Sequence, residues 1–276
     1  MKSAALGFCL SILTFLDFGA APAWAQLAPL NPEGVTLAHV HLAVKDVAAQ
    51  KAFWIDIMGG KPVKNGPVEL IEFPGVYIML RQSNDAAPPA GAILDHFGFV
   101  VKDMPAMVAK WKAHNLETQP TENPNEIYVV APDGIRVEVY GIPSLPTPIQ
   151  MNHLHYLAFD VPGMQAWYNR NLGAVISKRA CIGCVSKPSL IETVNMPGNV
   201  NFSFSVAKDR RAPTKGRSID HIGFEVKNLE AYVKDLEANG IKMDEQVRQI
   251  SNTKIKIAFL TDPWGTRIEL TENLAP

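Results

Sequence analysis

The feature that most constrains the fold is a strand-like stretch that occurs four times, about sixty residues apart. Each copy is an alternating apolar run with a histidine near its start and Asp or Asn at its end. The copies are LAHVHLAVKD from Leu37, LDHFGFVVKD from Leu94, MNHLHYLAFD from Met151 and IDHIGFEVKN from Ile219. A repeat of this length is one supersecondary unit that cannot bury its apolar face alone, so the units must pack on one another.

Each unit continues with the same order of elements. An amphipathic segment with apolar residues at helical spacing follows each opening strand, and strand-like stretches follow the helix. Each unit therefore reads β-α-β-β-β, which predicts an α+β fold. The expected helices are 47–60, 104–116, 163–173 and 229–241. The expected later strands are 68–73, 76–81, 126–131, 135–141, 189–194, 200–206, 254–260 and 267–272.

Similarity among the four units sorts them into two kinds. The first and third open with H-x-H, whereas the second and fourth open with DH-x-GF and carry a late turn followed by Glu. The chain therefore reads as a duplicated pair of units. The proline-rich stretch 141–150 marks the boundary between the halves. This pattern predicts two domains of two units each, 26–146 and 147–276.

Residues 1–25 predict a secretory signal peptide. They have a basic start, an apolar middle and a small-x-small end at Ala23 and Ala25, which favours cleavage before Gln26. A retained membrane anchor is the alternative, disfavoured because the apolar run is short and Asp17 interrupts it. We therefore expect a periplasmic or secreted protein that makes no contact with a membrane after cleavage.

Charge and cysteine content narrow the classes of partner. The net charge is −1 and no basic stripe is present, which argues against a nucleic acid partner. The processed chain keeps Cys181 and Cys184 in CIGC. In an oxidising compartment we expect a loop disulfide or two idle thiols rather than half of a zinc site or a redox pair.

The strand openings, the AFWIDIMGG helix and the DGIRVE and DPWGTRIE ends resemble the vicinal oxygen chelate superfamily. That superfamily includes glyoxalase I, bleomycin and fosfomycin resistance proteins and extradiol dioxygenases. The resemblance covers essentially all of the chain after the signal peptide. It implies four βαβββ modules paired into two curled-sheet, half-barrel domains, each around a cavity with a divalent metal. The implied ligands are His39, His96 and Glu138 in the first half, and His153, His221 and Glu269 in the second.

Strand alternation supports these ligand positions. It places Val40, Leu42 and Val44 on one face of the first strand and His39 on the other. Glu138 and Glu269 likewise lie opposite their apolar neighbours. A carboxylate turned inward beside histidines is costly unless its charge is compensated, and a metal would compensate it. A decayed site, with the histidines satisfied by ordinary hydrogen bonds, is the alternative.

Two histidines and one carboxylate form the facial triad of non-haem Fe(II) oxygenases. Glyoxalase-type members of the superfamily use a fourth protein ligand. The matching positions here hold Met79 and Ser203, and neither replaces a carboxylate. The pattern therefore favours dioxygenase-like over glyoxalase-like chemistry.

The resemblance to extradiol enzymes is incomplete. Their second-sphere tyrosine is matched by Tyr128, but Phe259 stands at this place in the other half, and their second-sphere histidine is absent from both. His41 and His155 share the face of the proposed ligands and could supply the missing acid–base group. A hydrogen bond to a neighbouring strand, or replacement of His39 by His41 as ligand, are the alternatives.

Together these features predict an exported metal-dependent enzyme that oxidises a small oxygen-rich or aromatic substrate in dioxygenase-like fashion. Fe(II) is the favoured cofactor, with Mn or Zn as alternatives. A metal-dependent isomerase or lyase, and a non-catalytic small-molecule binding or resistance protein, are the alternative functions. The sequence leaves open whether the chain acts alone or as a homodimer.

Overall fold

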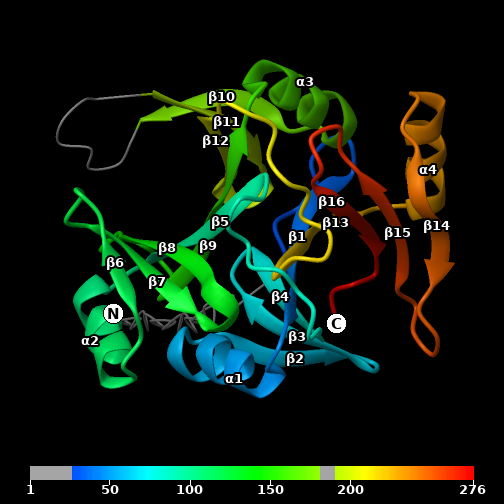
Figure 1. Cartoon of the computed structure of the whole chain (residues 1–276). Coiled ribbons are helices and arrows are strands. Elements are labelled where there is room, and N and C mark those ends of the chain that lie inside the picture. Colours follow the sequence, from blue (N-terminus) through cyan, green and yellow to red (C-terminus); the bar gives the residue numbers. More distant parts are fainter. Residues whose placement is uncertain (1–26, 181–189) are drawn as a thin grey trace, which may run out of the picture.

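The computed structural model describes residues 27–180 and 190–276 (Figure 1). The expected signal peptide and the pair Cys181 and Cys184 lie outside the described residues. All four predicted β-α-β-β-β units are present. The first is β1 (Val35–Val44), α1 (Val47–Lys51) with its π-helical continuation η1 (Ala52–Ile57), β2 (Lys61–Asn65), β3 (Val68–Phe73) and β4 (Val76–Gln82). The second is β5 (Leu94–Val101), α2 (Met104–Ala113), β6 (Thr118–Pro120), β7 (Glu126–Ala131), the turn η2 (Pro132–Gly134) and β8 (Ile135–Gly141).

The third and fourth units repeat this order. The third is β9 (Ile149–Ala158), α3 (Val161–Leu172), β10 (Val175–Ala180), β11 (Leu190–Met196), the turn η3 (Pro197–Asn199) and β12 (Val200–Val206). The fourth is β13 (Ile219–Val226), α4 (Leu229–Ala238), β14 (Met243–Gln249), β15 (Lys256–Thr261) and β16 (Arg267–Glu272). None of the described helices has the length and apolar character that crossing a bilayer requires.

The Asp or Asn that ends each repeat has a structural role. In every unit this residue is the N-cap of the following helix, and its side chain accepts a hydrogen bond from the backbone N–H three residues later. The caps are Asp46, Asp103, Asp160 and Asn228. The strand-to-helix switch is therefore encoded locally in each copy.

The sheets do not follow the two halves of the chain that we expected. One eight-stranded sheet has the order β14-β15-β16-β13-β1-β4-β3-β2 and the other β10-β11-β12-β9-β5-β8-β7-β6. The first sheet thus joins the first and fourth units, and the second sheet joins the second and third. Residues 26–146 and 147–276 each contribute one unit to each sheet. The proline-rich connection 141–150 runs from β8 to β9 within the second sheet instead of separating two sheets.

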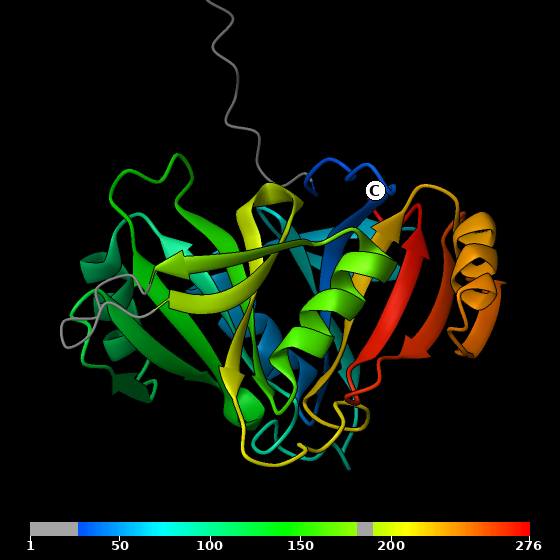
Figure 2. The same ribbon diagram turned by 90° about the horizontal axis from the view of Figure 1, so that it is seen from above.

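The opening strands lie at the centre of both sheets. β1 runs antiparallel to β13 and parallel to β4, while β5 runs antiparallel to β9 and parallel to β8. The connection between the first and second units lies beside the connection between the third and fourth, bridged at Ala87–Arg217 and Ala92–Ala212. In Figures 1 and 2, α2 and α4 lie at opposite ends of the molecule.

One face of each sheet packs into a single large apolar core. Val40, Leu42 and Val44 belong to that core, as predicted, and so do Trp54 and Trp111. The ladder of β1 with β13 is irregular between Leu37 and His39, which keeps the histidines off the core face. We call the opposite face of each sheet its histidine face.

Candidate metal centres

Four side chains meet on the histidine face of the first sheet. β1 supplies His39 and His41, β13 supplies His221 and β16 supplies Glu269. Oε2 of Glu269 lies 2.9 Å from Nε2 of His39 and 2.9 Å from Nε2 of His221. One potential ligand atom from each of the four residues lies within 4.8 Å of the others. We call these residues the first cluster.

The second sheet carries an equivalent group. It consists of His96 from β5, Glu138 from β8, and His153 and His155 from β9. Oε2 of Glu138 lies 2.5 Å from Nε2 of His96 and 3.2 Å from Nε2 of His153. We call these residues the second cluster. Each cluster thus offers three imidazoles and one carboxylate.

All six residues proposed as ligands are brought into the two clusters, but in groups that differ from our expectation. His39 does not meet His96 and Glu138, and His153 does not meet His221 and Glu269. The reason is the sheet order: β1 pairs with β13 and β9 pairs with β5, so His39 and His153 exchange places. The assignment of these residues as metal ligands stays a prediction.

Burial and charge favour a cation in each cluster. None of the six residues is more than 6% exposed. Burial raises the pKa of Glu138, but hydrogen bonds and charge from His153 and His96 outweigh it and hold the pKa well below its usual range. Glu269 behaves in the same way beside His221 and His39. Each buried carboxylate is therefore ionised and shared by two imidazoles, a donor set that suits a divalent metal.

Outer hydrogen bonds orient the imidazoles. Nδ1 of His221 lies 2.7 Å from Asp220, and Nδ1 of His96 lies 2.7 Å from Asp95. Burial lowers the pKa of both histidines, but the neighbouring carboxylates have the larger combined effect, so the pKa of each histidine is raised. Nδ1 of His153 lies 2.9 Å from Oδ1 of Asn152. Such contacts leave Nε2 facing the cluster, as second-shell partners do in metal sites.

Gly98 and Gly223 leave room for the imidazole of the neighbouring strand. A Cβ on Gly223 would lie 1.9 Å from Cε1 of His39, and one on Gly98 would lie 2.3 Å from Cε1 of His153. No side chain fits at either position while the ring stays in place. The glycine of the DH-x-GF repeats is therefore explained by the packing of the clusters.

Gly223→Ala is expected to weaken metal binding at the first cluster at least about tenfold, because the added methyl displaces the ring of His39. Gly98→Ala is the matched variant and is expected to weaken only the second cluster. Zinc titration by calorimetry on both variants checks this. If a variant bound zinc at both clusters as tightly as the unsubstituted protein, the ring position would not matter for binding.

The two additional histidines differ in their contacts. His41 has no hydrogen-bond partner at either ring nitrogen, and its ring centroid lies 4.5 Å from that of His221. Nε2 of His155 lies 2.8 Å from Oγ of Ser205, whereas its Nδ1 has no partner. Burial lowers the pKa of His155 to about 3 and that of His41 well below its usual range. Both rings are therefore neutral at ordinary pH.

A phenol hydrogen-bonded to the carboxylate distinguishes the second cluster from the first. The hydroxyl of Tyr128 donates to Oε2 of Glu138 at 3.0 Å, and its ring lies edge-on to His96. Phe259 holds the same register position opposite Glu269. Tyr140 also lies at the second cluster, 6.1 Å from His153 between ring centroids. Burial, followed by the charge of Glu138, raises the pKa of both phenols far above its usual range.

Sequence reasoning missed part of this site. Tyr140, Asp95 and Asp220 were assigned no role, although a signal was present: Tyr140 lies two residues after Glu138 on one strand face, and each Asp directly precedes a proposed ligand.

Met79 and Ser203, at the positions where glyoxalase-type members have their fourth ligand, lie in register with His41 and His155.

Comparison with known proteins agrees with the fold. The family model of the Glyoxalase/Bleomycin resistance protein/Dioxygenase superfamily matches residues 36–174 and 150–270. These matches span most of the chain, so the chain belongs to this superfamily. No curated protein matches the sequence significantly.

Solved structures share the whole architecture at low sequence identity. Glyoxalase I from Zea mays superposes with a TM-score of 0.69 at 15% identity, covering 87% of this chain and 92% of that one. A Bacillus subtilis protein proposed to be a dioxygenase gives a TM-score of 0.63 at 12% identity, covering 87% and 86%. At such identities the likeness establishes the fold alone.

Proposed function

We propose that this protein is a metal-dependent enzyme that acts at the second cluster by dioxygenase-like oxidation of a small oxygen-rich or aromatic substrate. The observation that carries the proposal is the group of His96, His153 and Glu138 with the Tyr128 phenol bonded to the carboxylate. A divalent metal bound there would supply Lewis acidity toward substrate oxygens, and Fe(II) would add redox chemistry. The two named relatives, a glyoxalase and a proposed dioxygenase, fit this general class.

Side chains around the second cluster favour an oxygen-rich substrate. Several positions on its histidine face are polar where the matching positions of the first sheet are apolar. Strand registers match Tyr128 with Phe259, Ser203 with Met79, Glu126 with Ile257, and Ser177 with Val63, whereas Tyr140 is matched by the polar Thr271. Hydroxyl and amide groups can orient hydroxyl or carbonyl oxygens of a small molecule, which aliphatic groups cannot.

Three residues at the second cluster could act on a bound substrate. Tyr128, neutral because its pKa is raised, can donate a hydrogen bond to a substrate oxyanion. His155, neutral and free at Nδ1, can accept a hydrogen bond from a bound substrate. Arg179 donates through Nε to Oγ of Ser203 at 3.1 Å, so its charge lies near enough to favour an anionic group.

The free Nδ1 of His155 also supports a second candidate, a metal-dependent isomerase or lyase. There the same nitrogen would move a proton between two carbons or oxygens of the substrate, without consumption of oxygen. The two candidate reactions differ in whether oxygen is consumed, which can be measured.

The test is to purify the protein anaerobically, measure its metal content and follow oxygen uptake with catechol-like compounds. Iron together with oxygen uptake supports the oxidation. Zinc or manganese, with substrate conversion but no oxygen uptake, supports the isomerase or lyase. Stoichiometric binding of ligands with neither metal nor turnover would overturn both and leave a binding protein.

We further propose that the enzyme is exported, with the mature chain beginning at Gln26. Intact mass measurement of the protein recovered from the periplasm or medium is expected to give residues 26–276. A mass that includes residues 1–25 would contradict cleavage. A small molecule is the expected partner, and self-association into a homodimer stays a prediction that light scattering can check.

A further inference from the structure

We infer that the first cluster is a closed four-ligand metal site, completed by His41, that holds the first sheet together instead of turning over substrate. The inference rests on the proposed function only in assigning chemistry to the second cluster. Its own support comes from His41, from the apolar residues around the first cluster and from the strands that the cluster joins.

The position of His41 suits a metal ligand. Both of its ring nitrogens are buried without a hydrogen-bond partner, a costly arrangement for a polar ring. One ligand atom of His41 lies within 4.8 Å of those of His39, His221 and Glu269. A metal bound by all four groups would satisfy one of the two nitrogens. His155 differs in that only its Nδ1 lacks a partner, because Ser205 already holds its Nε2.

An apolar cluster lies beside the first cluster. Its buried members are Ala38, Leu70, Tyr77, Ile255, Ile257, Phe259 and Leu274, with Leu27, Val63, Val68, Met79 and Ile250 packed against them. Phe259 lies 5.3 Å from the ring of His221, and Tyr77 lies in register with His39. Four protein ligands complete a tetrahedral zinc, the usual form of a structural zinc site, and the mostly apolar surround offers few polar groups to orient a substrate.

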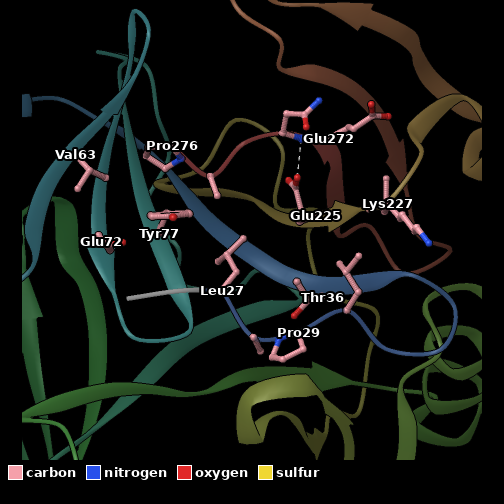
Figure 3. Close-up of a pocket in the computed structure, with 15 residues that line it drawn as sticks. Leu27, Pro29, Thr36, Val63, Glu72, Tyr77, Glu225, Lys227, Glu272 and Pro276 are labelled. Atoms are coloured by element: carbon pink, nitrogen blue, oxygen red, sulfur yellow. Dashed lines mark hydrogen bonds between the residues drawn. The ribbon is translucent and has the colours of Figure 1, made fainter. Parts of the chain in front are cut away.

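A pocket on this side of the sheet has none of the ligands in its lining. It measures about 730 Å³ and is lined by Leu27, Thr36, Tyr77 and Glu225 among others, but by no member of the first cluster. In Figure 3 the side chain of Leu27 lies between Tyr77 and Thr36. Leu27 and Tyr77 belong to both the pocket wall and the apolar cluster, so the apolar cluster separates the pocket from the histidines.

The first cluster also joins the two ends of the fold. His39 and Glu269 are 230 residues apart, whereas Glu138 and His153 in the second cluster are 15 apart. The first cluster bridges β1 to β13 and β16, the contact by which the first and fourth units form one sheet. A metal here would hold closed a contact that nothing local in the sequence maintains.

The test uses the full protein with Glu138→Gln, which leaves the first cluster as the intact site, and Co²⁺ as the probe. We expect one tightly bound Co²⁺ with the intense visible absorption of four-coordinate cobalt. Adding His41→Ala to this variant should weaken zinc binding at least about tenfold and reduce that absorption. The matched control adds His155→Ala to Glu269→Gln, where the loss of affinity should be clearly smaller.

An unchanged cobalt spectrum and zinc affinity after His41→Ala would overturn the inference. If that variant does not fold, X-ray absorption of zinc-loaded Glu138→Gln protein decides the matter. Three imidazoles and one carboxylate oxygen support the inference, and two imidazoles with water ligands overturn it. None of these measurements requires turnover, so they can be interpreted even if the proposed reaction is not found.

Discussion

Glu138→Gln is expected to reduce kcat/KM more than about 100-fold, because it removes the ionised oxygen that joins His96, His153 and Tyr128. Glutamine keeps the shape of the side chain but carries no charge to compensate a divalent metal. Glu269→Gln is the matched change at the equivalent strand position and is expected to lower turnover far less per folded molecule. Steady-state kinetics with metal analysis of both variants provides the measurement.

Tyr128→Phe refines this experiment, because it gives the second cluster the residue that the first cluster has at Phe259. We expect it to keep its metal but to lose about tenfold or more in kcat, since the proton donor beside Glu138 is gone. If Glu269→Gln, and not Glu138→Gln, abolished turnover, the reaction would belong to the first cluster and the assignment of the two sites would be reversed.

The order of elements could be predicted from the sequence because it repeats locally. Each unit carries its own alternating strand, capping residue and amphipathic helix, so four weak signals reinforce one another. The first of the three strands expected after each helix was not located in the sequence. β2, β6, β10 and β14 are the edge strands of the two sheets, and residues such as those of KPVKN are largely exposed, so no apolar alternation marks them.

The pairing of units could not be predicted, because it depends on contacts between distant strands with similar sequences. β1 could join β5 or β13 with the same alternation and a histidine at the same place. The residues of the clusters were nonetheless found, since the face on which a side chain lies is a local property of its strand. His41, His155 and Tyr128 reached the clusters for this reason, whereas the grouping of His39 and His153 required the sheet order.

Zinc is expected to raise the Tm of the Glu138→Gln protein by about 10 °C at a thousandfold excess over Kd. Such an excess stabilises the native state by about 4 kcal/mol if the unfolded chain does not bind the metal. For a protein of this size each kcal/mol corresponds to about 2–4 °C. Differential scanning fluorimetry with and without zinc, at fixed protein concentration, provides the measurement.

The Glu269→Gln protein, which retains only the second cluster, is expected to gain clearly less at the same ratio of zinc to Kd. In the second cluster Glu138 is 15 residues from His153 and 42 from His96, so an unfolded chain can bring these ligands to zinc by closing shorter loops than the first cluster needs. Binding to the unfolded state subtracts from the stabilisation. His39 and Glu269, 230 residues apart, meet only when the first and fourth units share a sheet. Equal gains in the two variants would therefore show that the first cluster has no special part in holding the fold together.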